Sequence, residues 1–241
     1  MFLVIYQKRI VTQENRLQKL ENERQQFLLK ATIEGQERER ERLAKDLHDG
    51  IGSLLSALNL NLKFQKSREN LDKEQKFFLV EACEMVEEGI KNVRSVSHNL
   101  MPSTLENFGL ITAMKECISP INKLGTINTQ IKLINTPFQL PKTLALGLLR
   151  VFQELVQNTL KHANASQITA SLEFHVNCIY FTYTDSGEGF NFTSSNSNGI
   201  GIKNIESRIQ ALDGTFFINH NTNKGYLIEI EVPIVTKSKK A

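Results

Sequence analysis

The sequence has few cysteines and little net charge, which excludes several classes of protein. Cys83, Cys117 and Cys178 are odd in number, lie far apart and lack the paired spacing of a zinc site or a redox motif. We therefore expect reduced thiols with a structural role in a cytosolic compartment. The net charge is only +3, and basic residues are interleaved with acidic ones, so nothing requires direct binding to nucleic acid.

A hydrophobic run long enough to cross a membrane is missing at the N-terminus. The apolar segment covers residues 1–6 and is followed by Lys8 and Arg9, whereas a spanning helix needs about 20 residues. Its order, apolar then basic, is the reverse of a secretory signal and resembles the inner end of a transmembrane helix. Two interpretations stay open: residues 1–10 belong to a membrane anchor, or they end a short helix that is buried or binds a partner.

Common phosphate-binding motifs are also absent. The chain has no Gly-x4-Gly-Lys-Ser/Thr loop, no third glycine to complete a dinucleotide fingerprint, and none of the signatures of serine and tyrosine kinases. Any nucleotide site in this chain therefore uses a different arrangement.

Proline is absent and glycine is rare between residues 12 and 66, where Glu, Arg, Gln and Leu dominate. This composition predicts one long helix, or two in series. A second amphipathic helix is expected over residues 71–100, ended by Pro102. Apolar residues on the first helix recur every three or four positions in two stripes: Leu17, Leu20, Phe27 and Ala31, then Leu43, Leu47, Ile51, Leu54, Leu58 and Leu62.

Two long antiparallel helices with exposed apolar stripes predict a four-helix bundle made by two chains. The alternative is a monomeric hairpin, which would leave most of the stripe in water. After residue 103 the pattern alternates between helices, over 110–124 and 140–163, and strands. The expected strands cover residues 127–134, 167–174, 178–184, 214–219 and 226–233, and a Gly, Ser and Asn-rich stretch over 186–201 opens a helix that ends at 212.

We therefore expect an α+β chain, in which a long helical hairpin dimerises and an α/β sandwich domain follows. The expected boundaries are 1–35 for a membrane-proximal or coiled-coil helix, 36–104 for the bundle, 105–236 for the sandwich and 237–241 for a tail.

The first element with chemical potential is the stretch from Arg40 to Ser53 on the first bundle helix. It places His48 beside Asp49 in a charged environment. An imidazole next to a carboxylate can serve as a nucleophile with an orienting base, although most such pairs are simply solvated surface residues.

The second element is a polar helix face. Glu154, Asn158 and Lys161 or His162 fall on one side of the helix at spacings of four, seven and eight. The Asn carbonyl oxygen suits Mg²⁺, which prefers oxygen ligands, and Lys or His can meet phosphate oxygens.

The third and fourth elements are acidic and glycine-rich. Asp185 ends a strand and is followed by Gly187 and Gly189, so that an acceptor for the adenine amino group lies where backbone can approach a base. Gly199 and Gly201 form a flexible loop at a helix N-terminus that can face phosphates.

Together these elements resemble the sensor histidine kinases of two-component systems, in the subfamily whose phosphoacceptor box contains a His-Asp pair. The later three elements resemble the N, G1 and G2 boxes of the Bergerat-type ATPase fold that histidine kinases share with gyrase. Two further stretches, Ser97 to Pro102 and Gly109 to Ala113, look like that subfamily's exit from the bundle. The resemblance covers nearly all of residues 36–235.

The resemblance implies that His48 is phosphorylated from ATP and passes the phosphoryl group to an aspartate on the receiver domain of a response regulator. In this scheme Asp49 orients the imidazole, Lys45 steadies the transferred charge and Asn158 holds Mg²⁺. It further implies a homodimer, a bundle that carries the phosphotransfer histidine, and a catalytic domain on the cytoplasmic side. The implied ATP-binding residues are Glu154, Asn158, Lys161, His162, Asp185, Gly187, Gly189, Gly199 and Gly201.

Two positions depart from the family pattern. Members of the subfamily often carry Gln five residues after the histidine, where this chain has Ser53, so we expect weak phosphatase activity toward the regulator. The family commonly shows Gly-Thr before the last strand, where this chain has Gly225-Tyr226, so the adenine contact is expected to be remodelled. Two other hypotheses stay open: a nucleotide-binding dimeric scaffold whose His48 is never phosphorylated, and a Bergerat-type kinase that acts on serine.

Overall fold

The structure is a computed structural model that describes residues 2–68, 70–135, 140–187, 200–219 and 225–234. Contacts within the chain separate it into two units. One unit is Glu34–Ser103, and the other combines Met1–Ile33 with Thr104–Ala241.

A long helical segment opens the chain. Helix α1 (Phe2–Asp46) continues through η1 (Leu47–Gly52), a π-helix, into α2 (Ser53–Lys66). The flanking residues Asp46 and Ser53 keep helical dihedral angles, so the helical backbone is not interrupted. The helix begins ten residues before the predicted start at residue 12. Within the described ranges, no helix has the length and apolar character that crossing a membrane requires.

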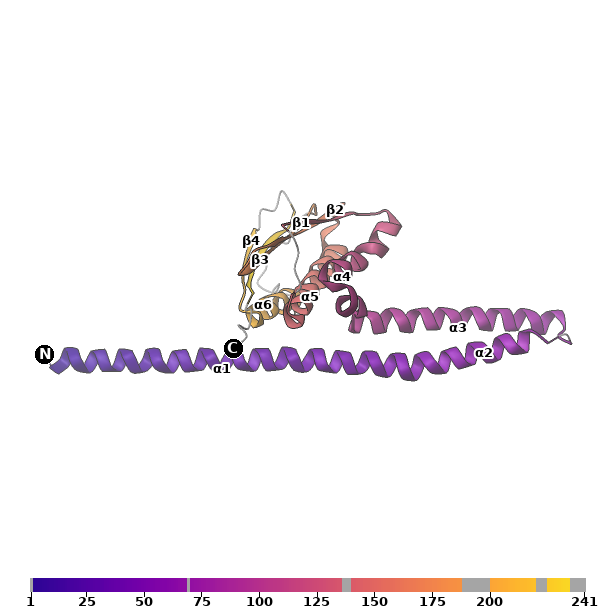
Figure 1. Cartoon of the computed structure of the whole chain (residues 1–241), viewed down its shortest axis with the longest axis horizontal. Coiled ribbons are helices and arrows are strands. Elements are labelled where there is room, and N and C mark those ends of the chain that lie inside the picture. The colour runs from indigo at the N-terminus through magenta and orange to yellow at the C-terminus, as the bar shows by residue number, and fades with distance from the viewer. Residues whose placement is uncertain (1, 69, 136–139, 188–199, 220–224, 235–241) are drawn as a thin grey trace. The chain divides into compact units, whose positions relative to one another are not determined.

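Helix α3 (Lys73–Leu100) returns antiparallel to α2, and the two lie side by side in Figure 1. Its N-terminus is closed by a capping box, in which Asp72 and Gln75 each accept a hydrogen bond from the other's backbone N–H. At one end of the hairpin Ser97 Oγ donates to the carbonyl oxygen of Ala44 over 2.9 Å. At the other end Lys63 and Glu87 form an ion pair of 2.8 Å. These contacts set the register of the two helices.

The hairpin buries very little of its apolar surface. Among the described hydrophobic residues of this unit, Ala44 and Cys83 are the buried ones. Large apolar side chains remain exposed along both helices: Leu43, Ile51, Leu54, Leu58, Leu60, Phe64, Phe77, Phe78, Met85 and Val96. A structure with this much uncovered apolar surface is typical of a partial bundle that needs further helices.

The second unit contains the expected α/β domain, and its elements follow the predicted order. Its first helix has left-handed dihedral geometry at Gly109, where φ is 80°, immediately before the predicted helix start at Leu110. The elements are α4 (Ser103–Leu124), β1 (Asn128–Ile134), α5 (Lys142–Asn158), the π-helix η2 (Thr159–Ala163), β2 (Gln167–Phe174), β3 (Cys178–Asp185), α6 (Ile200–Ala211), β4 (Thr215–Asn219) and β5 (Leu227–Pro233).

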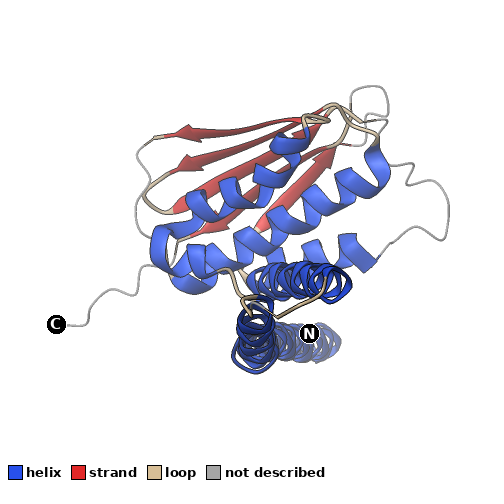
Figure 2. Cartoon of the chain, turned by 90° about the vertical axis from the view of Figure 1, so that its right-hand side faces the viewer, coloured by secondary structure: helices blue, strands red, loops and turns tan. Residues whose placement is uncertain are grey.

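The strands form one sheet in the order β1-β2-β3-β5-β4, with β1 parallel to β2 and all other neighbours antiparallel. Alternate residues of β2, β3 and β5 are buried, as expected for a sheet covered on one face. Figure 2 shows the helices of this domain on a single side of the sheet. The fold class predicted from the sequence, a helical hairpin followed by an α/β sandwich, is therefore confirmed.

Candidate functional site

His48 lies in η1 with its imidazole largely exposed, at 69% of its full side-chain area. Its Nδ1 is 2.9 Å from Oδ1 of Asp49. A carboxylate at this distance favours the tautomer in which Nδ1 carries the proton and donates it to Asp49. The lone pair of Nε2 then faces away from Asp49 and is available to an incoming electrophile.

The π-helix around His48 was not expected from the sequence. Such segments are rare and appear mostly as single turns inside α-helices, often at functional sites. A π-helix has more residues per turn than an α-helix. Ser53 therefore lies nearer to the helix face of His48 than it would in an α-helix, where five residues cover about 1.4 turns. Ser53 begins α2 and is exposed. Lys45, one turn before His48 on α1, is also exposed.

Asp185 of the second unit has a buried carboxylate, with 6% of its surface exposed. Its Oδ1 accepts hydrogen bonds from the backbone N–H of Gly187 over 2.9 Å and of Tyr226 over 3.4 Å. Its Oδ2 accepts from the hydroxyl of Thr159 over 2.7 Å. Donors from η2, from the turn after β3 and from the residue before β5 therefore hold one carboxylate group.

Two glycines allow the backbone to close around Asp185. A Cβ atom on Gly187 would lie 2.3 Å from the carbonyl oxygen of Ala163, at the end of η2. Gly225 has a φ of 85°, and a Cβ there would lie 1.9 Å from the carbonyl oxygen of Asp185. Neither space can hold a side chain unless the backbone moves, because real Cβ atoms essentially never come within 3.0 Å of such neighbours. Gly187 was predicted as a site residue, whereas the close approach at Gly225 was not.

The polar face of α5 meets the first turn of α6. A Cβ on Gly201 would lie 2.6 Å from Oε1 of Glu154 and 3.1 Å from Oδ1 of Asn158. The structure thus brings the predicted N-box residues and the predicted G2-box glycine together, although they are far apart in the sequence. A carboxylate and an amide oxygen beside a helix N-terminus form a donor set that suits a hard cation and phosphate oxygens.

The remaining predicted residues lie around this cluster or outside the described residues. Lys161 and His162 are exposed on η2, which follows Asn158 directly. Gly189 and Gly199 are outside the described residues.

Sequence reasoning missed two residues beside Asp185. Thr159 and Tyr183 are both buried, and their hydroxyl oxygens are 2.7 Å apart. Thr159 directly follows Asn158. Tyr183 precedes Asp185 by two positions in β3, so the side chains of Tyr183 and Asp185 both point to the buried face of the sheet. That period of two was the signal that could have identified Tyr183.

Tyr226 occupies the position where the family pattern has threonine. It is buried on the core face, and the pKa of its phenol is raised, first by burial and then by the negative charges of Asp185 and Glu206. The phenol is therefore protonated at neutral pH. Its backbone N–H and C=O both bond to Asp185, the C=O accepting from the Asp185 N–H over 3.0 Å.

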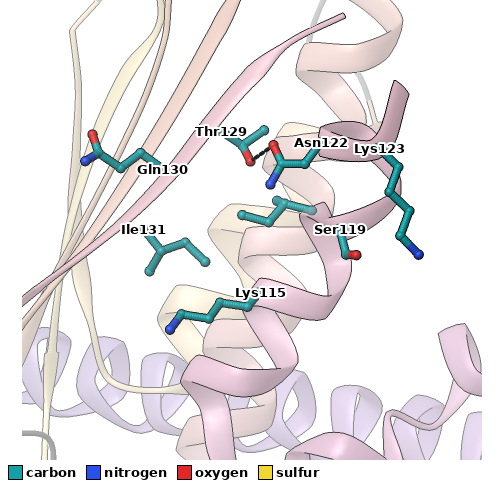
Figure 3. Close-up of a pocket in the computed structure, with 8 residues that line it drawn as sticks. Lys115, Ser119, Asn122, Lys123, Thr129, Gln130 and Ile131 are labelled. Carbon is teal, nitrogen blue, oxygen red and sulfur yellow. Dashed lines mark hydrogen bonds between the residues drawn. The ribbon is translucent and has the colours of Figure 1, made fainter. Parts of the chain in front are cut away.

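A separate cavity of about 560 Å³ lies between α4 and β1 (Figure 3). Across it, Thr129 Oγ1 donates to Oδ1 of Asn122 over 2.5 Å. Lys115 extends toward Ile131, whereas Lys123 is directed away from β1 in Figure 3. None of the lining residues belongs to the four sequence motifs: Lys115, Ile118, Ser119, Asn122, Lys123, Thr129, Gln130 and Ile131.

Comparison with known proteins gives two family matches in sequential order. Residues 39–105 match the histidine kinase model HisKA_3. Residues 143–236 match the model described as histidine kinase-, DNA gyrase B-, and HSP90-like ATPase. The first match contains His48 and Asp49, and the second contains Glu154, Asn158 and Asp185.

Curated relatives carry the same assignment. The chain is 28% identical over 218 residues to the signal transduction histidine-protein kinase/phosphatase DegS of Brevibacillus brevis, covering 89% of this chain and 56% of that protein. It is 28% identical over 223 residues to the oxygen sensor histidine kinase NreB of Staphylococcus carnosus, covering 90% of this chain and 63% of that protein.

Among solved structures, a blue-light activated histidine kinase of Erythrobacter litoralis aligns with a TM-score of 0.49 at 14% identity, covering 68% of this chain and 62% of that chain. The chain thus spans between 56% and 63% of the two curated relatives. With a phosphoacceptor-type hairpin and an ATPase-type sheet domain matched in this order, the chain belongs to the sensor histidine kinase family of two-component systems.

Proposed function

We propose that this protein uses ATP to phosphorylate His48 and then transfers the phosphoryl group to an aspartate on the receiver domain of a response regulator. The observation that carries this proposal is the exposed His48 bonded through Nδ1 to Asp49, in one chain with the buried Asp185 cluster. Family membership supports both halves, because the phosphoacceptor and ATPase models match these two regions.

The phosphoacceptor geometry suits in-line attack on phosphorus. With its proton on Nδ1 and held by Asp49, His48 presents the Nε2 lone pair to the γ-phosphorus of ATP. The new N–P bond forms as the bond to the β,γ-bridging oxygen breaks, and ADP leaves with that electron pair. Lys45, one turn away, steadies the negative charge on the transferred group. The phosphoramidate then gives its phosphoryl group to the regulator's aspartate.

ATP binds in the second unit, with Asp185 accepting a hydrogen bond from the adenine amino group. The phosphates lie toward Glu154, Asn158 and the first turn of α6, where the missing side chain of Gly201 lets the two α5 side chains come close. Lys161 and His162 on the exposed side of η2, together with the backbone at Gly187, Gly189 and Gly199, complete the set. Asn158 would hold Mg²⁺ through its carbonyl oxygen, and the ion, when bound, neutralises phosphate charge.

The exposed apolar stripe supports a homodimer. Leu54 and Leu58 on α2 and Met85 on α3 are all exposed in the single chain, Met85 to 73%. Burying each such side chain against a second hairpin is worth roughly 1.5 to 3 kcal/mol. A second copy offers the same stripe, and a two-fold axis completes a four-helix bundle. The bundle surface around His48 then receives the response regulator.

We also propose that residues 36–104 form the dimerisation and phosphotransfer domain and that residues 105–236 form the catalytic domain, on the cytoplasmic side of the inner membrane. The apolar segment at residues 1–6 followed by Lys8 and Arg9 supports an N-terminal attachment to the membrane. Protease digestion of intact membrane vesicles tests this location. Complete digestion of the N-terminal segment, whichever side of the membrane the protease is on, would contradict it.

The first prediction concerns the phosphoacceptor. His48→Gln is expected to abolish acid-labile, base-stable label from γ-labelled ATP while leaving ATP affinity within about twofold, because residue 48 belongs to the helical unit. His175→Gln, which changes another histidine with a half-exposed side chain, is the matched control and should label normally. Acid-labile, base-stable label on the His48 variant would show that another residue is the phosphoacceptor. Acid-stable label would support a serine kinase, and bound ATP without any label would support the scaffold.

The second prediction concerns the nucleotide pocket. Asn158→Ala is expected to weaken Mg²⁺-dependent ATP binding, and Asp185→Asn to weaken adenine recognition, each by about ten- to a hundredfold, because one charged or metal-linked contact is lost. Calorimetric titration measures both affinities, and thermal unfolding shows that the variants fold. Gln157→Ala, on the exposed side of α5, is the control. Native affinity in both site variants would rule out the pocket.

The third prediction tests the dimer. Leu54→Glu places a charge on the apolar stripe and, across a two-fold axis, brings two like charges together. We therefore expect the dissociation constant of the dimer to rise by at least about a hundredfold. Analytical ultracentrifugation of the full chain gives the measurement. Ser56→Glu, an exposed position on the opposite face of α2, should leave the dimer intact. A native chain that sediments as a monomer contradicts the proposal.

The fourth prediction concerns Ser53. A Gln at this position could both accept from and donate to a water that attacks the regulator's acyl phosphate, whereas the shorter serine needs an additional bridging water, which costs up to about 2 kcal/mol. Ser53→Gln is therefore expected to accelerate dephosphorylation of purified phosphorylated regulator in the presence of ADP and to leave labelling of His48 unchanged. Rapid dephosphorylation by the native protein would refute this expectation.

A further inference from the structure

Three buried side chains form a hydrogen-bonded series beneath the proposed adenine site. Tyr183 Oη lies 2.7 Å from Oγ1 of Thr159, and that hydroxyl lies 2.7 Å from Oδ2 of Asp185. Tyr183 is fully buried, and Thr159 and Asp185 are 2% and 6% exposed. Burying a polar group without a hydrogen-bond partner costs folding free energy. Each group in the series therefore needs a partner, which fixes the arrangement of their protons.

The direction of the series follows from the available hydrogens. Thr159 has one hydroxyl proton and donates it to Asp185. The Tyr183 phenol is protonated, because burial raises its pKa and the nearby charge of Asp185 adds to that effect. The single phenolic proton of Tyr183 has two acceptors within reach, Oγ1 of Thr159 at 2.7 Å and the carbonyl oxygen of Leu155 at 3.3 Å, and the shorter distance favours donation to Thr159. The Tyr183 phenol thus sets the orientation of the Thr159 hydroxyl, and that hydroxyl sets the orientation of the Asp185 carboxylate.

Counting acceptor positions shows which oxygen of Asp185 can meet a ligand. Oδ1 already receives the N–H groups of Gly187 and Tyr226, which occupy both of its lone pairs. Among the residues that the structure describes, Oδ2 receives one donor, Thr159, which leaves one of its lone pairs. An amino group on a bound base must therefore bond to Oδ2, the oxygen whose direction Thr159 sets.

We infer that Thr159, held by Tyr183, is a positioning residue that aims Oδ2 of Asp185 at the amino group of adenine and so sets the preference for 6-amino over 6-oxo purine nucleotides. The inference rests on the proposed nucleotide site. Removing the hydroxyl leaves the carboxylate held only by the two donors on Oδ1, so that the direction of Oδ2 is less restricted. A 6-oxo purine gains little from a well-directed Oδ2, because it presents a carbonyl oxygen in place of the amino group. Thr159 touches no part of the ligand and acts through Asp185.

The test compares ATP with inosine triphosphate, which carries oxygen in place of the amino group, by calorimetric titration of the full chain. Thr159→Val keeps the shape and removes the hydroxyl, and Thr159→Ser keeps the hydroxyl. We expect the valine variant to lose about tenfold in affinity for ATP and almost none for inosine triphosphate, whereas the serine variant retains the native ratio. Tyr183→Phe should reduce the same ratio by a smaller factor. In an Asp185→Asn background, Thr159→Val should have no further effect.

The outcomes separate the two proposals. If the native chain binds neither nucleotide, or binds both equally, the proposed adenine site is wrong and this inference is wrong with it. If the native chain prefers ATP and the valine variant keeps that preference, the site stands and the role of Thr159 is refuted. Equal losses for both nucleotides in the valine variant would assign Thr159 a structural role only, which also overturns the inference, and thermal unfolding measures that contribution directly.

Discussion

The carboxylate of Asp185 connects three segments of the ATPase-type domain by hydrogen bonds. It is buried, and it accepts hydrogen bonds from η2, from the turn after β3 and from the residue before β5. A buried carboxylate without such donors would cost several kcal/mol, so these segments must stay in register around it. The close approaches at Gly187 and Gly225 exist for this reason, because any side chain there would separate the backbones that supply the donors. Within the described part of the chain, the same arrangement leaves one lone pair of Oδ2 without a donor.

The two units bury apolar surface in different ways. The sheet domain encloses its own core, with Phe152, Phe181 and Tyr183 at its centre in edge-to-face contacts. The helical hairpin has almost no core of its own and leaves its apolar stripe uncovered. In the proposed dimer, a second hairpin would cover this stripe.

Much of the architecture was predictable because it rests on local patterns. The period of the apolar residues predicted the α2–α3 hairpin, and the period of two predicted β2, β3 and β5 to within a residue or two. The π-helices were not predictable, since inserting one backbone residue into a helix leaves no signature in composition or period. The parallel pairing of β1 with β2 and the cavity beside β1 also depend on contacts between distant segments.

The sequence by itself determined which residues are proposed to carry the chemistry: His48 beside Asp49, the polar face of α5 and the acidic strand end at Asp185 are readable from residue type and spacing. It also determined that the helices expose an apolar stripe, because helical periodicity is a local property. Only the tertiary structure decided that Thr159 and Tyr183 support Asp185, that Gly201 lies against Glu154 and Asn158, and that Gly225 must have no side chain. These facts depend on distances of a few ångströms between segments far apart in the chain, which close packing of the whole domain sets and no local pattern encodes.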